Sequence, residues 1–224
     1  MRSLFRPVLV AITLSIVGCG GEDKDDDDDD DDGAGTDSGV DTDPDTDPDT
    51  DSDTDVVEGD GTEVTMVTSM GTIVIDLDAE TAPITTANFL SYAESGFFDG
   101  ADGQGATVFH RVVDGFVAQG GGYTASGTEK STLAPIVLES DVGLSNLRGT
   151  IAMARTGVPD SATSQFYFNL VDNTFLDYQD ASSPGYAVFG EVVQGMDVVD
   201  AIGAVATNGE VPAEDIIIES VSVR

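Results

Sequence analysis

The clearest pattern of apolar and polar positions lies in residues 61–78, where two runs rich in valine, isoleucine and threonine flank a short break. The break, Ser69-Met70-Gly71, has the composition of a turn. Two such runs separated by a turn are typical of a β-hairpin. We therefore expect two antiparallel strands at the start of the globular part of the chain.

A different period follows in residues 81–96, where apolar side chains recur at helical spacing. Thr81 is the expected N-terminal cap of this helix, Pro83 lies near its first turn, and Gly96 is expected to end it. A second, short helix is predicted over residues 196–202.

Six further segments are short apolar or alternating runs bounded by turn residues, which indicates strands. They are residues 107–112, 116–120, 149–154, 165–170, 188–193 and 216–223. The segment 122–146 is polar and poorly patterned, so we expect loops folded over one surface. Short strands with only two helices favour an antiparallel barrel or sandwich.

Charge divides the chain into two parts. Of its 224 residues, 43 are acidic and 8 are Lys or Arg, a formal net charge of -35. Between Glu22 and Asp60 lie 21 of the acidic residues, whereas residues 61–224 carry 22 acidic and 5 basic residues, a net charge of -17. Both parts would repel phosphate, so no nucleic acid is expected as a partner.

Residues 19–60 are expected to form a disordered acidic linker before a folded domain at 61–224. Repelling aspartates extend such a chain, and its apolar content is too low for a core. The DxDxD spacing resembles calcium loops but lacks the glycine at the sixth position and the glutamate at the twelfth, so weak calcium binding at most is expected. The sequence leaves open a calcium-responsive surface adhesin with this tract as its functional part.

Residues 1–18 have the features of an export signal. Arg2 and Arg6 precede an apolar run at residues 8–17, which is too short for a full membrane span. The string IVGC at residues 16–19 contains the only cysteine, so no intrachain disulfide can form.

The same string resembles a bacterial lipobox. This resemblance implies cleavage before Cys19 and lipid attachment to it, which would anchor the protein in the cell envelope. Gly20 in the next position implies the outer membrane, with the domain either periplasmic or surface-exposed. The alternative is an ordinary signal peptide with an incidental cysteine.

Five strings occur in an order that resembles the cyclophilins, which are peptidyl-prolyl cis-trans isomerases, and the bacterial type above all. They are FHRVVDGFVAQGGG at 109–122, GTIAMAR at 149–155, SQFYFNL at 164–170, FLD at 175–177 and YAVFGEVVQGMDVVD at 186–200. The resemblance covers nearly all of residues 63–223. It implies a mainly β fold, an eight-stranded antiparallel closed barrel capped by two α-helices, with neither metal nor cofactor.

The implied reaction is rotation about the peptide bond before proline. Resonance sets a barrier of ~18–20 kcal/mol. The two isomers differ by only ~0.5–1 kcal/mol, yet exchange takes tens to hundreds of seconds. Because no covalent bond breaks, the catalyst needs a pocket for the ring and dipoles that favour the twisted amide.

The motifs imply a role for each site residue. Arg111 matches the catalytic arginine that donates to the prolyl nitrogen, and Gln119 matches the glutamine that binds substrate backbone and orients the arginine. His110 has no proton to transfer in a rotation and is expected to support the cleft. The other expected substrate contacts are Phe116, Val117, Met153, Ala154, Arg155, Tyr167, Phe175, Leu176 and Tyr186.

The sequence departs from the family at the pocket. Tyr167 stands where phenylalanine is usual, and its hydroxyl needs a partner if it is buried. Val117 stands where many members have methionine, and Phe175 where many eukaryotic members have tryptophan.

We expect the chain to be a monomer. Its expected partners are proline-containing peptides, unfolded or exported proteins, and the membrane through the lipid. A tethered, non-catalytic binding module or chaperone is the alternative.

Overall fold

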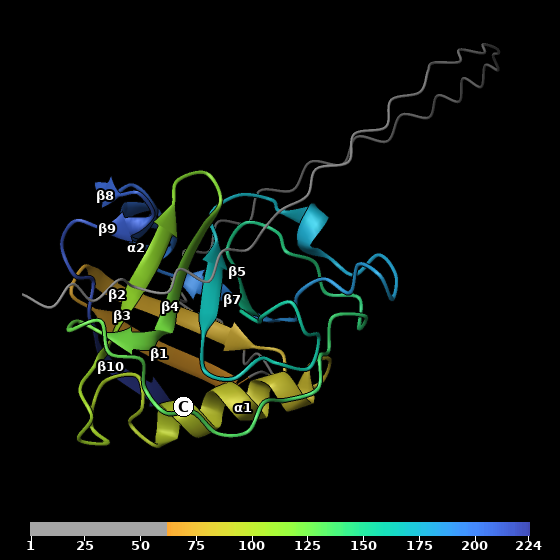
Figure 1. Cartoon of the computed structure of the whole chain (residues 1–224), viewed down its shortest axis with the longest axis horizontal. Coiled ribbons are helices and arrows are strands. Elements are labelled where there is room, and N and C mark those ends of the chain that lie inside the picture. The colour runs from red at the N-terminus through yellow and green to blue at the C-terminus, as the bar shows by residue number, and fades with distance from the viewer. Residues whose placement is uncertain (1–61) are drawn as a thin grey trace, which may run out of the picture. The chain divides into compact units, whose positions relative to one another are not determined.

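The computed structural model describes residues 62–224, in which eight strands form one antiparallel sheet (Figure 1). The strands are β1 (Thr62–Thr68), β2 (Gly71–Leu77), β3 (Thr107–Val113), β4 (Val117–Thr124), β5 (Thr150–Met153), β6 (Phe166–Asn169), β7 (Val188–Gln194) and β10 (Ile218–Val223). Their order across the sheet is β10-β1-β2-β7-β5-β6-β4-β3. An antiparallel bridge between Val108 and Ile217 joins the two ends, so the sheet curves into a nearly closed barrel. The predicted fold class is confirmed.

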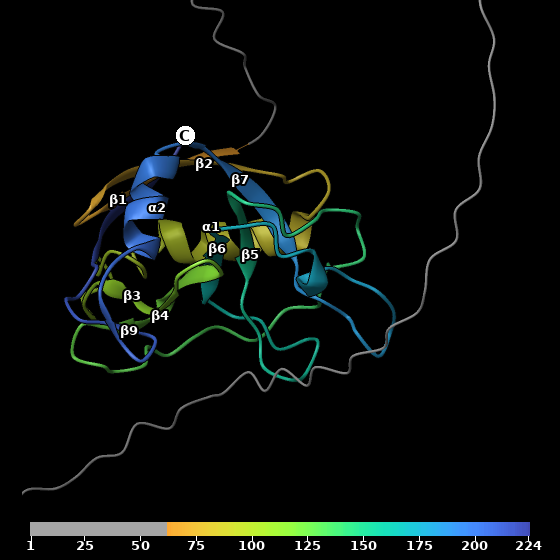
Figure 2. The same cartoon turned by 90° about the horizontal axis from the view of Figure 1, so that it is seen from above.

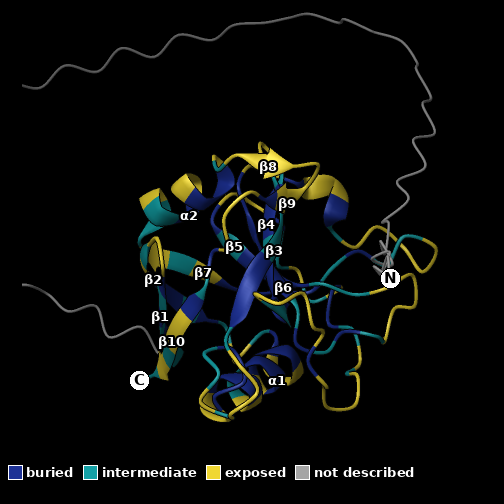
Figure 3. Cartoon of the chain, turned by 60° about the vertical axis from the view of Figure 1, so that its left-hand side comes forward, coloured by how far each residue is buried: buried dark blue, intermediate teal, exposed yellow. Residues whose placement is uncertain are grey.

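Two α-helices accompany the barrel, as the sequence predicts. They are α1 (Pro83–Glu94) and α2 (Met196–Gly203), and Figures 1 and 3 place them at opposite ends of the barrel. The sequence did not predict the 3-10 turn η1 (Thr174–Leu176) or the small hairpin of β8 (Thr207–Asn208) and β9 (Val211–Pro212). In the described part of the chain, every helix is too short or too polar to cross a membrane.

The interior of the barrel is filled largely by aromatic rings. Phe89 of α1 lies 5.2 Å from Phe98, 5.6 Å from Phe166 and 5.3 Å from Phe189, measured between ring centroids. Such rings bury large apolar areas, and their tilted and edge-to-face contacts further stabilise the core. Figure 3 shows the buried residues along the barrel strands and the inner side of α1, so the helix and the sheet share one core.

The hairpin turn is tighter than predicted. Thr68 pairs with Gly71, so only Ser69 and Met70 connect the strands. Gly71 has a φ of 140°, and a Cβ there would lie 2.8 Å from a methyl carbon of Val198 in α2. A glycine is therefore needed where the hairpin meets the second helix.

The segment between β4 and β5 contains no helix and no strand, and Figure 2 shows it, in green, following the outside of the barrel. The loops predicted for residues 122–146 are confirmed from residue 125 on, whereas residues 122–124 belong to β4. Two isolated bridges, Tyr123 with Glu129 and Ile136 with Ala162, fix its course.

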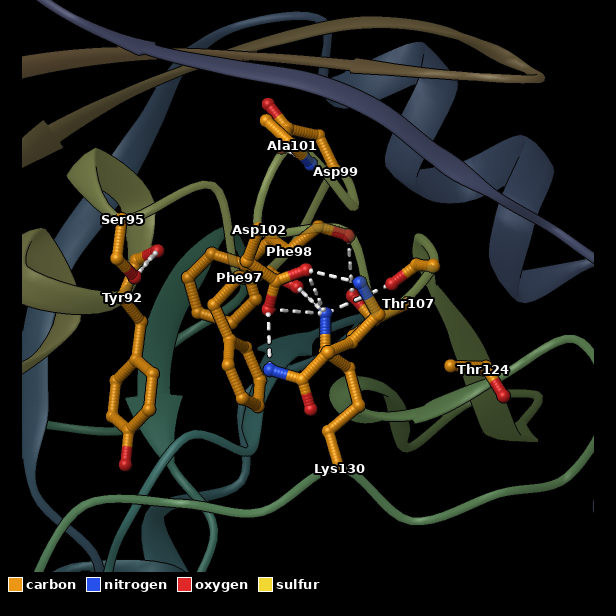
Figure 4. A network of polar contacts seen from close by, with 12 residues as sticks. Tyr92, Ser95, Phe97, Phe98, Asp99, Ala101, Asp102, Thr107, Thr124 and Lys130 are labelled. Atoms are coloured by element: carbon orange, nitrogen blue, oxygen red, sulfur yellow. Dashed lines mark hydrogen bonds and ion pairs between the residues drawn. The ribbon is translucent and has the colours of Figure 1, made fainter.

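Lys130 anchors the first part of that segment (Figure 4). Its buried ammonium nitrogen donates to the carbonyl oxygens of Phe97 at 2.6 Å and Gly105 at 2.8 Å, and to Oδ1 of Asp102 at 3.0 Å. Burial alone would raise the pKa of Asp102, but the N–H of Gln104 and the charge of Lys130 hold it below its ordinary value. The lysine thus ties two loops that are distant in sequence.

The start of α1 differs from the prediction. Ala82, not Thr81, is the N-terminal cap residue, and its side chain makes no capping hydrogen bond. Instead the carboxylate of Glu139 accepts the N–H of Ile84 at 3.2 Å, and the N–H and hydroxyl of Thr85, both at 2.7 Å. A carboxylate is a strong acceptor and also complements the positive end of the helix dipole. The expectation for Thr81 is therefore wrong because a remote loop satisfies the helix end.

Replacing this carboxylate should destabilise the fold. We expect Glu139→Ala to lower the free energy of unfolding by about 1–3 kcal/mol, because it leaves buried donors without an acceptor. The matched control is Glu80→Ala, which removes an exposed carboxylate before the same helix and should change stability by less than about 0.5 kcal/mol. Urea unfolding measures both variants, and equal midpoints would contradict the capping role.

Candidate active site

Arg111 and Gln119 lie opposite each other on β3 and β4. The pairing of these strands shifts register between Thr107 and Phe109 and again between Phe109 and Arg111. Such bulges bend a strand and redirect its side chains. Gly121 has a φ of 80°, and a Cβ there would lie 2.8 Å from the Phe166 ring. The predicted bend or bulge in residues 120–122 is confirmed.

The guanidinium of Arg111 lies beside an aromatic ring and a carboxylate. Its Cζ is 5.9 Å from the ring centroid of Phe116, which itself stacks on the exposed ring of Phe175 at 5.8 Å. Its Nε donates to Oε2 of Glu210 at 2.7 Å and its Nη2 to Oε1 at 3.3 Å. The side chain is 22% exposed, so it retains access to a ligand from solvent.

A small apolar cluster, separate from the main core, adjoins this arginine. Its buried members are Val117, Ala152, Tyr167, Leu176 and Val188, with Phe116, Leu144, Ala154 and Tyr186 partly buried against them. Six of the predicted substrate contacts therefore come together here. They are Phe116, Val117, Ala154, Tyr167, Leu176 and Tyr186.

Because side chains alternate between the two faces of each strand, this cluster and the main core lie on opposite faces of the sheet. Successive strand residues point to opposite faces, so Ala152 of β5 joins the small cluster while Ile151 and Met153 join the main core. Likewise Tyr167 of β6 lies in the cluster between two core phenylalanines. Met153 was predicted to lie beside the pocket, but its side chain is buried in the core; direct substrate contact by it stays a prediction.

The Tyr167 hydroxyl has the partner that the sequence required. It donates to Oδ1 of Asn146 at 2.8 Å, and the side chain is buried. Burial, together with the neighbouring Tyr186 and Asp177, raises the pKa of Tyr167 well above its ordinary value. The hydroxyl therefore stays protonated and acts as a donor, which offsets the cost of burying it.

Asn146 belongs to a buried amide network that the sequence did not reveal. Asn169 donates to Oδ1 of Asn146 at 3.3 Å, and Asn173 donates to Oδ1 of Asn169 at 2.8 Å. Asn173 also donates to the carbonyl of Phe116 at 3.0 Å, and Asn146 to Oδ1 of Asp177 at 2.8 Å. Asn146 and Asn173 lie outside the strands and Asn169 ends β6, so no periodic pattern links the three, and only the fold shows that they support one side of the cluster.

In the described part of the protein, the side chains of Gln119 and Arg155 form no hydrogen bond with Arg111. Gln119 Nε2 donates to Oε1 of Gln165 at 2.9 Å, and no hydrogen bond joins it to Arg111 within residues 62–224. The guanidinium is held by Glu210, and the orienting role expected of Gln119 stays a prediction. Arg155 lies over the ring of Tyr186, with Cζ 4.5 Å from the centroid, and its Nε donates to the carbonyl of Gly185.

The backbone next to Arg155 is also engaged. The N–H of Ala154 donates to the carbonyl of Gln165 at 2.9 Å. A substrate strand that pairs with this segment would therefore have to use other backbone groups.

His110 is a largely buried, neutral side chain. Its ring lies 4.8 Å from that of Tyr123, and its Nδ1 has no hydrogen-bond partner in the described part of the protein. Burial, with the positive charge of Arg111 contributing, lowers the pKa of His110 to about 4. A supporting role for His110 stays a prediction.

In residues 62–224, no group of three or more His, Cys, Asp or Glu side chains could hold a metal ion.

The pKa of His110 predicts how stability depends on pH. The folded pKa of about 4 lies below the ordinary 6.5, so the unfolded chain binds more protons between these values. Protonation of this histidine in the unfolded chain should therefore lower the free energy of unfolding by about 3 kcal/mol as the pH drops from 6.5 to 4. His110→Asn should flatten this part of the profile. His110 is the only histidine, so its NMR titration is unambiguous, and a midpoint near 6.5 would contradict this account.

The site lies in a region that matches a known family. The model of the family described as "Cyclophilin type peptidyl-prolyl cis-trans isomerase/CLD" matches residues 63–223. The chain is 50% identical over 167 residues to peptidyl-prolyl cis-trans isomerase B of Escherichia coli (strain K12), covering 71% of this chain and 98% of the relative. It is 47% identical over 167 residues to peptidyl-prolyl cis-trans isomerase A of Dickeya dadantii (strain 3937), covering 72% and 84%.

Solved structures share the fold at lower identity. A cyclophilin type peptidyl-prolyl cis-trans isomerase of Cryptosporidium parvum, determined in the presence of the dipeptide Ala-Pro, has a TM-score of 0.59 and 22% identity, covering 72% of this chain and 98% of that one. At this identity the likeness concerns the fold alone. Together with the family model and the bacterial relatives, it leads to one conclusion: the chain belongs to the cyclophilin-type peptidyl-prolyl cis-trans isomerase family.

Proposed function

We propose that this chain accelerates rotation about Xaa-Pro bonds in exported or envelope proteins and so assists their folding. The observation that carries the proposal is the placement of Arg111. Its guanidinium lies 5.9 Å from the Phe116 ring, at the margin of the small apolar cluster, and its backbone pairs with that of Gln119 on β4.

The chemistry follows from the electronic structure of the amide. In the planar bond the nitrogen lone pair is delocalised, whereas in the twisted bond it becomes a hydrogen-bond acceptor. A guanidinium carries only N–H donors and a positive charge, so Arg111 can donate to that nitrogen. A reduction of the barrier by about 5–8 kcal/mol gives a ~10⁴–10⁶-fold acceleration, and a charge-assisted bond that forms only in the transition state contributes part of it.

The apolar cluster supplies the complementary part of the site. Val117, Tyr167 and Leu176 offer an apolar surface for a proline ring, and Phe116 links this surface to the arginine. The buried bond from Asn173 to the Phe116 carbonyl and that from Tyr167 to Asn146 hold the surface in place. Side chains that are already ordered lose little entropy on binding, which favours recognition of short segments.

The envelope location rests on the sequence pattern of residues 1–60, which lie outside the described residues. A lipid on Cys19 would anchor the protein, and the acidic residues 19–60 would act as a spacer between lipid and domain. Exported chains would then be the accessible clients. Weak calcium binding by this tract stays a prediction.

Arg111→Ala tests the catalytic proposal. We expect the exchange rate of Xaa-Pro peptides at a given enzyme concentration to fall at least tenfold, because the donor to the prolyl nitrogen is lost. The control is Arg148→Ala, which removes an exposed arginine that pairs with Asp200 at 2.8 Å away from the site. Protease-free NMR exchange over a panel of Xaa-Pro peptides measures the rate. If wild type and Arg111→Ala exchange the peptides equally, the chain is better described as a non-catalytic binding module.

Cys19→Ser tests the anchor. Without the thiol no lipid can be attached, so the protein should move from the membrane fraction to the soluble fraction of the cell. Fractionation followed by immunodetection measures the distribution. A variant that stays wholly in the membrane fraction would show that the anchor is not a lipid on this cysteine.

A further inference from the structure

Glu210 is the acidic side chain that contacts Arg111. Of the five N–H donors of an arginine, it accepts one on Nε at 2.7 Å and one on Nη2 at 3.3 Å. The remaining donors, both on Nη1 and one on Nη2, are left for a ligand. This contact therefore fixes the plane of the guanidinium without occupying all of its hydrogen-bonding edge.

The backbone around Glu210 fixes its position relative to β3. Thr207–Asn208 and Val211–Pro212 pair as β8 and β9, so Gly209 and Glu210 form the two-residue turn of this hairpin. Gly209 has a φ of 74°, which suits a tight turn. The carbonyl of Glu210 accepts the N–H of Val112, the residue after Arg111, at 2.7 Å. Backbone and side chain of Glu210 thus bind adjacent residues of the same strand.

The pair contributes little to stability. The Glu210 side chain is 51% exposed, and exposed ion pairs are weak because solvent screens them and two long side chains lose freedom. The ion pair instead restricts the rotamers that the Arg111 side chain can adopt. An arginine has several staggered torsions, and a fork-like contact at one edge selects among their combinations.

We infer that Glu210 is a positioning residue for Arg111: it holds the guanidinium in the orientation from which the free donors can reach a prolyl nitrogen. The inference rests on the proposed isomerase function and deepens it. In residues 62–224 the amide nitrogen of Gln119 donates to Gln165, and no hydrogen bond joins Gln119 to Arg111, so Glu210 is the side chain that holds the guanidinium.

Kinetics of Glu210 variants test the inference on the full-length protein. With Glu210→Ala we expect kcat for an Xaa-Pro peptide to fall about three- to tenfold, because Arg111 then samples several rotamers. KM should stay within about twofold, since the apolar pocket is untouched. Glu210→Gln keeps an oxygen acceptor and should recover part of the lost kcat. The matched control, Asp200→Ala, removes the carboxylate of the Arg148 pair and should leave both constants unchanged.

A second readout follows the arginine itself. The Nε–H resonance of Arg111 should shift in Glu210→Ala and return toward its original position in Glu210→Gln. A role confined to the stability of the hairpin would not produce this graded shift in step with kcat.

The outcomes separate this inference from the proposed function. If the wild type does not accelerate exchange, the proposed function fails and the inference fails with it. If the wild type is active, the inference alone is overturned by any of three results: an unchanged or raised kcat in Glu210→Ala, a change confined to KM, or an equal fall in Asp200→Ala. A raised kcat would mean that the carboxylate competes with substrate for the arginine.

Discussion

Val108 and Ile217 pair at the place where the two ends of the sheet meet. The N–H of Phe109 donates to the carbonyl of Ile216 at 3.0 Å, and this backbone bond is part of the bridge. Without it, β3 and β10 would each present an unpaired edge, and the aromatic core would be open on one side. β3 also carries Arg111, so the bond that closes the barrel also fixes the strand on which the proposed chemistry depends.

Core and site are built on opposite faces of the same short strands. On β6, Phe166 and Phe168 fill the barrel while Tyr167 between them lies in the small apolar cluster. On β4, Ala118 is in the core and Val117 and Gln119 are on the other face. A change in core packing therefore moves the site directly, because no flexible connection separates them. In this way the packing of the core also fixes the position of the small apolar cluster.

The sequence predicted those features that depend on local pattern or on shared motifs. Alternation and helical periodicity located the hairpin, both helices and the barrel strands, and the family strings located Arg111 and six residues of the cluster. Features that depend on contacts between remote segments were not predictable. Glu139 reaches the start of α1 from a loop without periodicity, and Glu210 is one of many acidic residues in an acid-rich chain. Thr81 had the right residue type for a cap, but such a local signal cannot show that a remote carboxylate already satisfies the helix.

Because Lys130 is buried, the chemical type of the cations on the surface of residues 62–224 is restricted. The chain has two lysines, and Lys24 lies outside the described residues. The Lys130 side chain is only 2% exposed, and its nitrogen is 4.5 Å from the centroid of the Phe97 ring. The cations that residues 62–224 offer to solvent are therefore guanidinium groups, which keep their charge at any physiological pH. Acylating enzymes and amine-directed labels act on accessible lysine amines, so this surface offers them no side-chain target.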